Sequence, residues 1–344
     1  MQISGELIKD KIIIKKPKEV GRLFNKSHFG KIISGNKLEL DLLEGVFLLE
    51  EKKILIYKNK EKIDFENLTK IAAKSISDFE VKYHAFKGLR NRGHAVKSYE
   101  KDENISFYNF NKTFFVSTHS ERDFLKIDES LDLIKKVKKK NKELWLGILD
   151  EEGDLTYYIM SLLDIKGKNK EQNYEKTKGL LLKDRVLIFG KTASEKLHKT
   201  EFFGKPFGDG LQLSIVESIY LQEKKVIDIF LADEKKVSIQ NLLNIVKESQ
   251  PDINLRFSVF KDLKKRGLLV KTGFKFGAHF RAYTKKPEDT HAEYLVHVVP
   301  KGFKSTWAEI SRAVRLAHSV NKEIAFARVD KNKIDYIKFG RLRP

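Results

Sequence analysis

The sequence contains the same pattern twice. Residues 86–98 read FKGLRNRGHAVKS and residues 260–272 read FKDLKKRGLLVKT. Three further pairs of segments match in the same order and at nearly the same spacing: 28–35 with 202–209, 40–54 with 213–227, and 141–150 with 321–330. Matches that recur in one order at one spacing indicate a duplicated unit. The chain therefore has to fold as two similar halves.

A polar segment separates the two copies. Residues 164–179, DIKGKNKEQNYEKTKG, are rich in Lys, Asn and Gly and have no hydrophobic periodicity, which is typical of a linker. We expect a structural first repeat over 1–165, a linker over 166–178 and a second repeat over 179–344. The second repeat divides further into an N-terminal subdomain over 179–255 and a C-terminal subdomain over 256–344.

Both copies show the same order of expected elements: a short β segment, then helices, then strands. In the second copy, Ser238 is placed to cap one helix, Gly267 to end another, and Thr306 with Glu309 to form the capping box of a third. We predict a mixed α/β (α+β) fold. It consists of two tandem copies of a two-subdomain unit, each ending in a mixed β-sheet flanked by helices.

The charge of the chain restricts its partners. It has 68 Lys and Arg against 48 Asp and Glu, a formal net charge of +20. Nucleic acid is the commonest partner of so basic a protein, although a solvated lysine-rich surface on a heat-adapted protein gives the same composition. No cysteine is present, which excludes disulfides, thiolate nucleophiles and Cys-ligated zinc.

The sequence contains no apolar run near the roughly 20 residues that a membrane helix needs. Its first ten residues, MQISGELIKD, lack the apolar core of a secretory signal. We therefore expect a cytoplasmic protein with no membrane partner.

Three polar residues of the second copy, Tyr283, His291 and Lys322, were compared with the residues at the aligned positions of the first copy. At the aligned positions the first copy has Asn109 (with Tyr108 beside it), Asn111 and Lys142. The first copy thus keeps the lysine and loses the histidine, while structural motifs such as FK-L--RG persist. A chemical role confined to the second copy predicts this difference, and a purely structural role does not.

An acidic loop shows the opposite asymmetry. Residues 149–154 of the first copy read LDEEGD, with four carboxylates: Asp150, Glu151, Glu152 and Asp154. The matching segment of the second copy, VDKNKID at 329–335, carries two lysines instead. Two interpretations are open. The loop is either a solvated hairpin or a plug for a basic groove on another subunit.

Three blocks of the second copy resemble the catalytic domain of the archaeal tRNA-splicing endonuclease family: RGLLVKTGFKFGAHFRAY, HAEYLVHVVP and RLAHSVNKEIAFARVD. The resemblance spans most of 179–344, and LQLSIVESIYL resembles the N-terminal subdomain of the family. The first half resembles the degenerate repeat of the homodimeric, tandem-repeat branch. The resemblance implies an endonuclease that removes introns from precursor tRNA by cutting bulge-helix-bulge RNA at two sites, without cofactor or metal.

The resemblance also implies a catalytic triad of Tyr283, His291 and Lys322. The implied reaction is metal-independent attack by a 2′-hydroxyl, as in a tRNA-intron lyase, which leaves a 2′,3′-cyclic phosphate and a 5′-hydroxyl. Such a reaction needs a base, an acid and a cation at the phosphate. His291 suits the acid because histidine titrates near neutrality, and Lys322 suits the cation. Tyr283 is either the base or a group that positions the 2′-hydroxyl.

Further roles follow from the same resemblance. Two arginines are expected to sandwich a bulged base, and they correspond to Arg315 and Arg341, with Arg343 as an open alternative to the latter. The acidic loop Asp150–Asp154 corresponds to the assembly loop of the homodimer.

Two other function classes remain open from the sequence. The first is a non-catalytic protein that binds structured RNA, in which the triad is incidental. The second is a metal-dependent DNA nuclease, for which Pro251–Asp252 and Glu80–Lys82 supply a motif in different copies and in the wrong order. Three neighbouring histidines are alternatives to His291: His279, His297 and His318.

Overall fold

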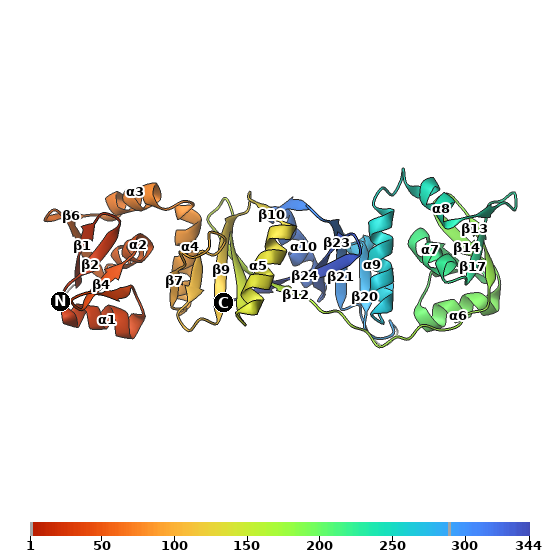
Figure 1. Ribbon diagram of the computed structural model, residues 1–344, viewed down its shortest axis with the longest axis horizontal. Helices are drawn as coiled ribbons and strands as arrows, with labels where there is room; N and C mark the ends of the chain where they lie inside the picture. The colour runs from red at the N-terminus through yellow and green to blue at the C-terminus, as the bar shows by residue number, and fades with distance from the viewer. Residues whose placement is uncertain (1–2, 288–289) are drawn as a thin grey trace.

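The structure is a computed structural model that describes residues 3–287 and 290–344. Four bodies lie in a row along an elongated molecule (Figure 1). The N-subdomains of the two repeats form its ends, and the two C-subdomains meet in the middle. The predicted fold class, mixed α/β in two tandem two-subdomain units, is confirmed. Among the described helices, none is both long and apolar enough to cross a membrane.

Each N-subdomain is a six-stranded sheet with three helices. The first runs through β1 (Ile3–Ile8), β2 (Lys11–Ile14), α1 (Pro17–Ser27), β3 (Lys31–Ile33), β4 (Lys37–Leu40), α2 (Leu42–Glu50), β5 (Ile54–Lys58), β6 (Glu61–Ile63) and α3 (Phe65–Ser75). The second runs through β13 (Thr177–Leu181), β14 (Arg185–Ile188), α6 (Lys191–Glu201), β15 (Lys205–Phe207), β16 (Gly210–Ser214), α7 (Ile215–Glu223), β17 (Ile227–Phe230), β18 (Lys236–Val237) and α8 (Ile239–Val246). The strand orders, β3-β4-β2-β1-β5-β6 and β15-β16-β14-β13-β17-β18, are equivalent.

Each C-subdomain begins with a helix and continues into strands. The first contains α4 (Phe79–Asn91), β7 (Val96–Ser98), β8 (Phe107–Asn109), β9 (Phe114–Ser120), β10 (Phe124–Lys126), α5 (Ile127–Lys139), β11 (Glu143–Leu149) and β12 (Leu155–Leu162). The second contains α9 (Ile253–Lys265), β19 (Leu269–Thr272), the 3₁₀ helix η1 (Phe274–Phe276), β20 (Phe280–Tyr283), β21 (Tyr294–Pro300), β22 (Lys304–Thr306), α10 (Trp307–Ser319), β23 (Glu323–Asp330) and β24 (Lys333–Leu342).

The predicted helix ends of the second copy are present. The Ser238 side chain accepts a hydrogen bond from the Asn241 backbone N–H at the start of α8. Thr306 and Glu309 form a full capping box on α10. Gly267 follows the end of α9 with a φ of 78°, a left-handed conformation that glycine adopts without a steric penalty.

The two C-subdomains share one ten-stranded sheet, of order β19-β20-β21-β23-β24-β12-β11-β9-β8-β7. The link is the antiparallel pair of β12 and β24, in which Met160 lies opposite Phe339. A second antiparallel pair joins β10 to β22. Helices α5 and α10 cover one face of the sheet and close a single hydrophobic core that spans both copies. Helices α4 and α9 pack on the other face, over two separate cores.

An ion pair between a buried arginine and a half-buried aspartate crosses the junction between the copies. Arg328 of β23 is only 6% exposed, and its Nε donates to Asp128 of α5 at 2.5 Å. The same guanidinium lies 3.1 Å from Asp330 and 3.6 Å from Asp335. The other oxygen of Asp128 accepts the backbone N–H of Gly302. This network fixes α5 of the first copy to the sheet of the second.

The segment between the copies also packs on the second one. Ile165 is fully buried in the core of the second copy. The backbone N–H groups of Gly167 and Asn169 donate to the carbonyls of Arg266 and Gly267, both at 2.9 Å. The beginning of this segment therefore follows α9 closely.

Arg328→Ala should destabilise the protein by about 2 kcal/mol, because Asp128 loses its buried cation and Asp335 keeps only the exposed Lys333, at 3.7 Å. Urea unfolding measures the change. Lys301→Ala is the control: it removes an exposed lysine from Asp330, and the loss should stay below about 0.5 kcal/mol. Equal losses in both variants would contradict a special role for the Arg328 pair.

Candidate active site

Three adjacent strands of the second C-subdomain have neighbouring ends: β20 finishes there, and β21 and β23 begin there. We call this end of the strands the edge of the sheet. Strand β20 is antiparallel to β21, and β21 is parallel to β23, with Tyr294 opposite Glu323. The last residue of β20 and the residues that precede β21 and β23 therefore lie at the same edge. These positions hold Tyr283, His291 and Lys322. The three sequence-predicted residues thus lie at the same end of these strands.

Tyr283 lies in an apolar contact between the two subdomains. Its side chain is 6% exposed and packs with Leu269 and Ala292, and Phe202 of the second N-subdomain packs against the same cluster. The guanidinium carbon of Arg281 lies 5.9 Å from the centroid of the tyrosine ring. The ring is therefore fixed on the N-subdomain side, with a cation beside it.

His291 follows a loop whose base is closed by hydrogen bonds. Thr284 donates its backbone N–H and its hydroxyl to the carboxylate of Glu293, at 2.8 and 2.5 Å. The backbone N–H of Glu293 donates to Ala282. His291 is exposed and directly precedes Ala292, which packs beside Tyr283. Within the loop, Glu288 and Asp289 lie outside the described residues.

Lys322 lies between the end of α10 and the start of β23. Its Nζ is 5.4 Å from the ring centroid of Phe276 and donates to the carbonyl of Val320 at 3.3 Å. Phe276 packs on the core beneath α10. The ammonium group therefore lies on the α10 side of the sheet.

The two predicted arginines, Arg315 and Arg341, are both exposed. Arg315 is on α10, off the buried stripe that Trp307, Ile310, Val314 and Ala317 form. Arg341 is on β24, and continuing the β23–β24 register from Ile324 and Phe339 sets it level with Lys322. Arg343 lies beyond the end of β24.

The acidic loop forms the tip of the β11–β12 hairpin. The Asp150 carboxylate accepts the backbone N–H groups of Glu152 and Asp154, at 3.1 and 2.8 Å. Glu151 is paired with Arg122. In the part of the chain that the structure describes, the carboxylates of Glu152 and Asp154 have no ion-pair partner. The loop belongs to the first copy and forms no part of the edge with Tyr283.

Two of the alternative histidines are partly buried. His297 stacks on Phe326, and burial together with neighbouring His279 lowers its pKa to about 4. His279 is in contact with Asp252, and burial and Arg256 lower its pKa. His318 is exposed in the last turn of α10. Across residues 3–287 and 290–344, no three His, Asp or Glu side chains are grouped to hold a metal ion.

Comparison with known proteins decides the family. The model of the tRNA intron endonuclease catalytic C-terminal domain matches residues 253–336, and that of the N-terminal domain matches 3–69 and 177–243. A tRNA-splicing endonuclease of Methanococcoides burtonii is 34% identical over 98% of this chain and 99% of its own length. The chain belongs to the tRNA intron endonuclease family. The resemblance inferred from the sequence is confirmed.

Other members of the family differ in length. A tRNA-splicing endonuclease of Methanosarcina barkeri is 33% identical over 97% of this chain and 98% of its own. One of Thermococcus kodakarensis is 35% identical over 45% of this chain and 95% of its own. The latter has about the length of one repeat, which agrees with a duplication in this endonuclease.

The structure corrects the counterpart of Tyr283 in the first copy. Val96 lies opposite Asn109, whereas the equivalent Val270 lies opposite Ala282. The residue that matches Tyr283 is therefore Phe110, and the alignment with Asn109 was wrong. The contacts agree, because Phe110 stacks on His28 with 4.2 Å between ring centroids, and His28 is the counterpart of Phe202.

The sequence alignment failed here because the copies differ in loop length. Between Tyr283 and His291 the second copy has residues 284–290, whereas Phe110 and Asn111 are adjacent. In the first copy a tight turn closes with Lys112 N–H on the Asn109 carbonyl. The first copy thus keeps an aromatic ring, loses its hydroxyl, and lacks the loop that carries a histidine.

Sequence reasoning missed the residue that joins the two subdomains. Lys271 of β19 donates to the carbonyls of Phe202 and Gly204, both at 2.5 Å, and lies 3.5 Å from Glu217. Burial lowers the pKa of Lys271, and Glu217 opposes this shift. In the first copy Lys97 likewise donates to the carbonyl of Gly30. The only sequence signal was the survival of this lysine and of the FGK segments in both copies.

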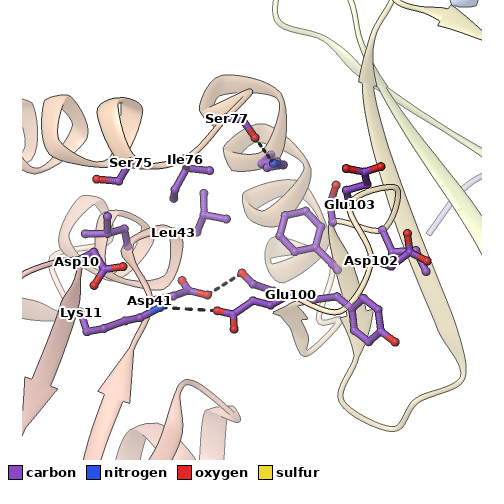
Figure 2. A pocket seen from close by; sticks show the side chains of 17 residues that line it. Asp10, Lys11, Asp41, Leu43, Ser75, Ile76, Ser77, Glu100, Asp102 and Glu103 are labelled. Atoms are coloured by element: carbon purple, nitrogen blue, oxygen red, sulfur yellow. Dashed lines mark hydrogen bonds and ion pairs between the residues drawn. The ribbon is translucent and has the colours of Figure 1, made fainter.

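The clefts at these joints are mainly basic in both copies. In the second copy a pocket of about 570 Å³ reaches Tyr283. It carries two carboxylates, Asp184 and Glu217, and five basic side chains: Arg185, His198, Lys205, Lys271 and Arg281. In the first copy the equivalent pocket, of about 540 Å³, carries four carboxylates and seven lysines: Lys11, Lys31, Lys97, Lys101, Lys112, Lys140 and Lys142. A neighbouring pocket of about 410 Å³ has two lysines, Lys11 and Lys82, and five carboxylates: Asp10, Asp41, Glu100, Asp102 and Glu103. Figure 2 shows Lys11 reaching across this pocket to Glu100.

Lys271→Met should destabilise the endonuclease by about 2 kcal/mol, because three buried acceptors on the N-subdomain lose their donor. Thermal unfolding measures the loss, and hydrogen exchange at Phe202–Gly204 should speed up. Lys205→Met, at an exposed position of the same cleft, is the control and should change neither. Unchanged exchange at this loop in Lys271→Met would contradict the proposed joint.

Proposed function

We propose that this protein removes introns from precursor tRNA by cutting bulge-helix-bulge RNA at two sites. The observation that supports the proposal is that Tyr283, His291 and Lys322 all stand at the same end of three neighbouring strands. This edge lies within the region that matches the family's catalytic domain. Relatives along the whole chain bear the name tRNA-splicing endonuclease, which supports the same substrate class.

The reaction is an intramolecular transfer at phosphorus. The 2′-oxygen attacks the adjacent phosphate, the bond from phosphorus to the 5′-oxygen breaks, and the 2′,3′-cyclic phosphate remains. The proton leaves the 2′-hydroxyl and another is delivered to the departing 5′-oxygen. No water is consumed, so the enzyme acts as a lyase.

Each triad residue has one task in this scheme. His291 donates the proton to the 5′-oxygen, and its exposed position leaves the imidazole accessible to RNA. Tyr283 accepts the proton of the 2′-hydroxyl or orients that hydroxyl. The Lys322 ammonium stabilises the charge that grows on the non-bridging oxygens.

Arg315 and Arg341 hold the base that is turned out of the bulge. Both side chains are exposed, and Arg341 lies level with Lys322 on the adjacent strand. Guanidinium planes stack on nucleobases without reading their identity. The net charge of +20 supplies the general attraction to the RNA backbone.

The active form is a homodimer with the acidic loop as its connector. Asp150–Asp154 form an exposed acidic hairpin, and the cleft beside Tyr283 carries five basic side chains. Insertion of the hairpin into the partner's cleft pairs opposite charges. A two-fold dimer then presents two catalytic edges to the two scissile bonds of one RNA.

Cleavage of bulge-helix-bulge RNA should survive EDTA, because a proton donor, a proton acceptor and a lysine carry the chemistry in place of a metal. The product ends, read by gel mobility before and after phosphatase or acid treatment, should be 2′,3′-cyclic phosphate and 5′-hydroxyl. Activity that disappears with EDTA and returns with magnesium would refute the scheme. Tight RNA binding without any cleavage would identify a non-catalytic RNA-binding protein.

Replacing Glu151 and Glu152 together by Lys should weaken the dimer at least tenfold, because like charges would then meet in the basic cleft. Sedimentation velocity across a concentration series measures the dimer, and cleavage should fall in parallel. The control exchanges Lys331 and Lys333, on the equivalent hairpin of the second copy, for Glu and should leave the dimer intact. A dimer that survives the first exchange would rule out the loop as its connector.

A further inference from the structure

The most exposed of the large apolar side chains that the structure describes belongs to Phe274. The residue is 88% exposed, whereas the next value among such side chains is 62%, at Phe124. A phenyl ring left in water loses most of the free energy that its burial provides, on the order of 1.5–3 kcal/mol. We therefore expect a binding partner to cover this ring, which lies near the candidate catalytic edge.

The backbone holds Phe274 firmly. It begins η1, where the N–H groups of Phe276 and Ala278 both donate to the carbonyl of Gly273. The N–H of Gly277 donates to the carbonyl of Phe274 at 2.9 Å. A Cβ on Gly273 would meet the Phe280 backbone at 2.9 Å, so only glycine fits this turn. The ring is therefore presented on a rigid support, which lowers the entropy lost when it binds a partner.

The turn is in contact with the candidate catalytic edge. The ring of Phe276 lies 5.4 Å from Nζ of Lys322 and 5.2 Å from Nζ of Lys275. Gly277 lies beneath Leu316 of α10, the neighbour in sequence of Arg315. Phe274 therefore stands two residues from the ring that contacts Lys322, on a turn that also touches α10.

The first copy builds the equivalent turn from other residues. Counting from the shared strand, Glu100 occupies the position of Phe274. The turn is tied to α5 by an ion pair between Asp102 and Lys136, and Lys136 is the counterpart of Leu316. The exposed aromatic ring therefore occurs only in the copy that carries Tyr283 and His291.

We propose that Phe274 stacks on an unpaired nucleobase of the bulge that contains the cleaved bond. This inference rests on the proposed function and adds a recognition residue to it. A nucleobase offers a flat face to the phenyl ring, while its phosphates meet Lys275 and Lys322. The acidic loop 150–154, the occupant proposed for the neighbouring cleft, consists of Asp, Glu and Gly and has no apolar side chain to cover the ring.

Binding to uncleavable RNA tests the contact directly. The RNA carries 2′-deoxy sugars at both cut sites, and each bulge nucleotide in turn is made abasic. Phe274→Ala should weaken binding of the intact RNA about 5- to 150-fold, the range measured for a stacked base. One abasic RNA should bind wild type and Phe274→Ala equally, because the base that the ring contacts is already missing.

Two further variants define the contact. Phe274→Tyr keeps the aromatic face and should restore the affinity, whereas Phe274→Leu keeps only an apolar side chain and should resemble Phe274→Ala. Phe189→Ala is the matched control, since Phe189 is 58% exposed on the second N-subdomain and should not affect binding.

Three results would overturn the stacking proposal. They are an equal loss on every abasic RNA, full affinity in Phe274→Leu, and dissociation of the Phe274→Ala dimer in sedimentation, which would mean that the partner subunit covers the ring. Wild-type protein that binds bulged RNA but does not cleave the all-ribose form would instead refute the proposed function. In that case the abasic series still decides whether Phe274 stacks.

Discussion

The antiparallel pairing of β12 with β24 determines how the rest of the molecule is arranged. It joins the two C-subdomains into one sheet and brings α5 and α10 over one core. Strand β24 is also the neighbour of β23, which begins immediately after Lys322. The contact of buried Arg328 with Asp128 adds an ionic link across the same junction. The first copy therefore supports the strands that end at the candidate active site.

The two copies share one fold but differ in the polar groups at equivalent positions. Phe110 and Tyr283 occupy equivalent positions and pack against equivalent partners, His28 and Phe202. The packing of the ring is thus independent of the hydroxyl, which the first copy lacks. The loss of the loop before Asn111 removes the histidine as well. The first copy thus contributes strands to the shared sheet and carries the acidic hairpin, and it has neither a tyrosine nor a histidine at these two positions.

Much of the fold, and the choice of candidate site residues, could be predicted from one sequence because the duplication allows the two copies to be compared. Repeats, helix caps and the fold class depend on local patterns, and these were confirmed. Strand partners are non-local, so nothing in the periodicity of β12 and β24 indicated that they pair. A fixed offset cannot locate a gap, so Asn109 was matched to Tyr283 where Phe110 belongs. The contact of Lys271 with Phe202 joins residues far apart in sequence, and exposure, as for Phe274, is a property of the folded chain alone.

The most direct test replaces His291 of the second copy by the residue found at the equivalent position of the first copy. His291→Asn introduces the side chain that Asn111 provides, and single-turnover cleavage of bulge-helix-bulge RNA measures the result. Cleavage should be slower by roughly 10² or more, the scale of losing a general acid, with RNA affinity unchanged. Asn111→Ala, the matched control, should cleave like wild type. Full activity in His291→Asn, or equal loss in both variants, would contradict a catalytic site confined to the second copy.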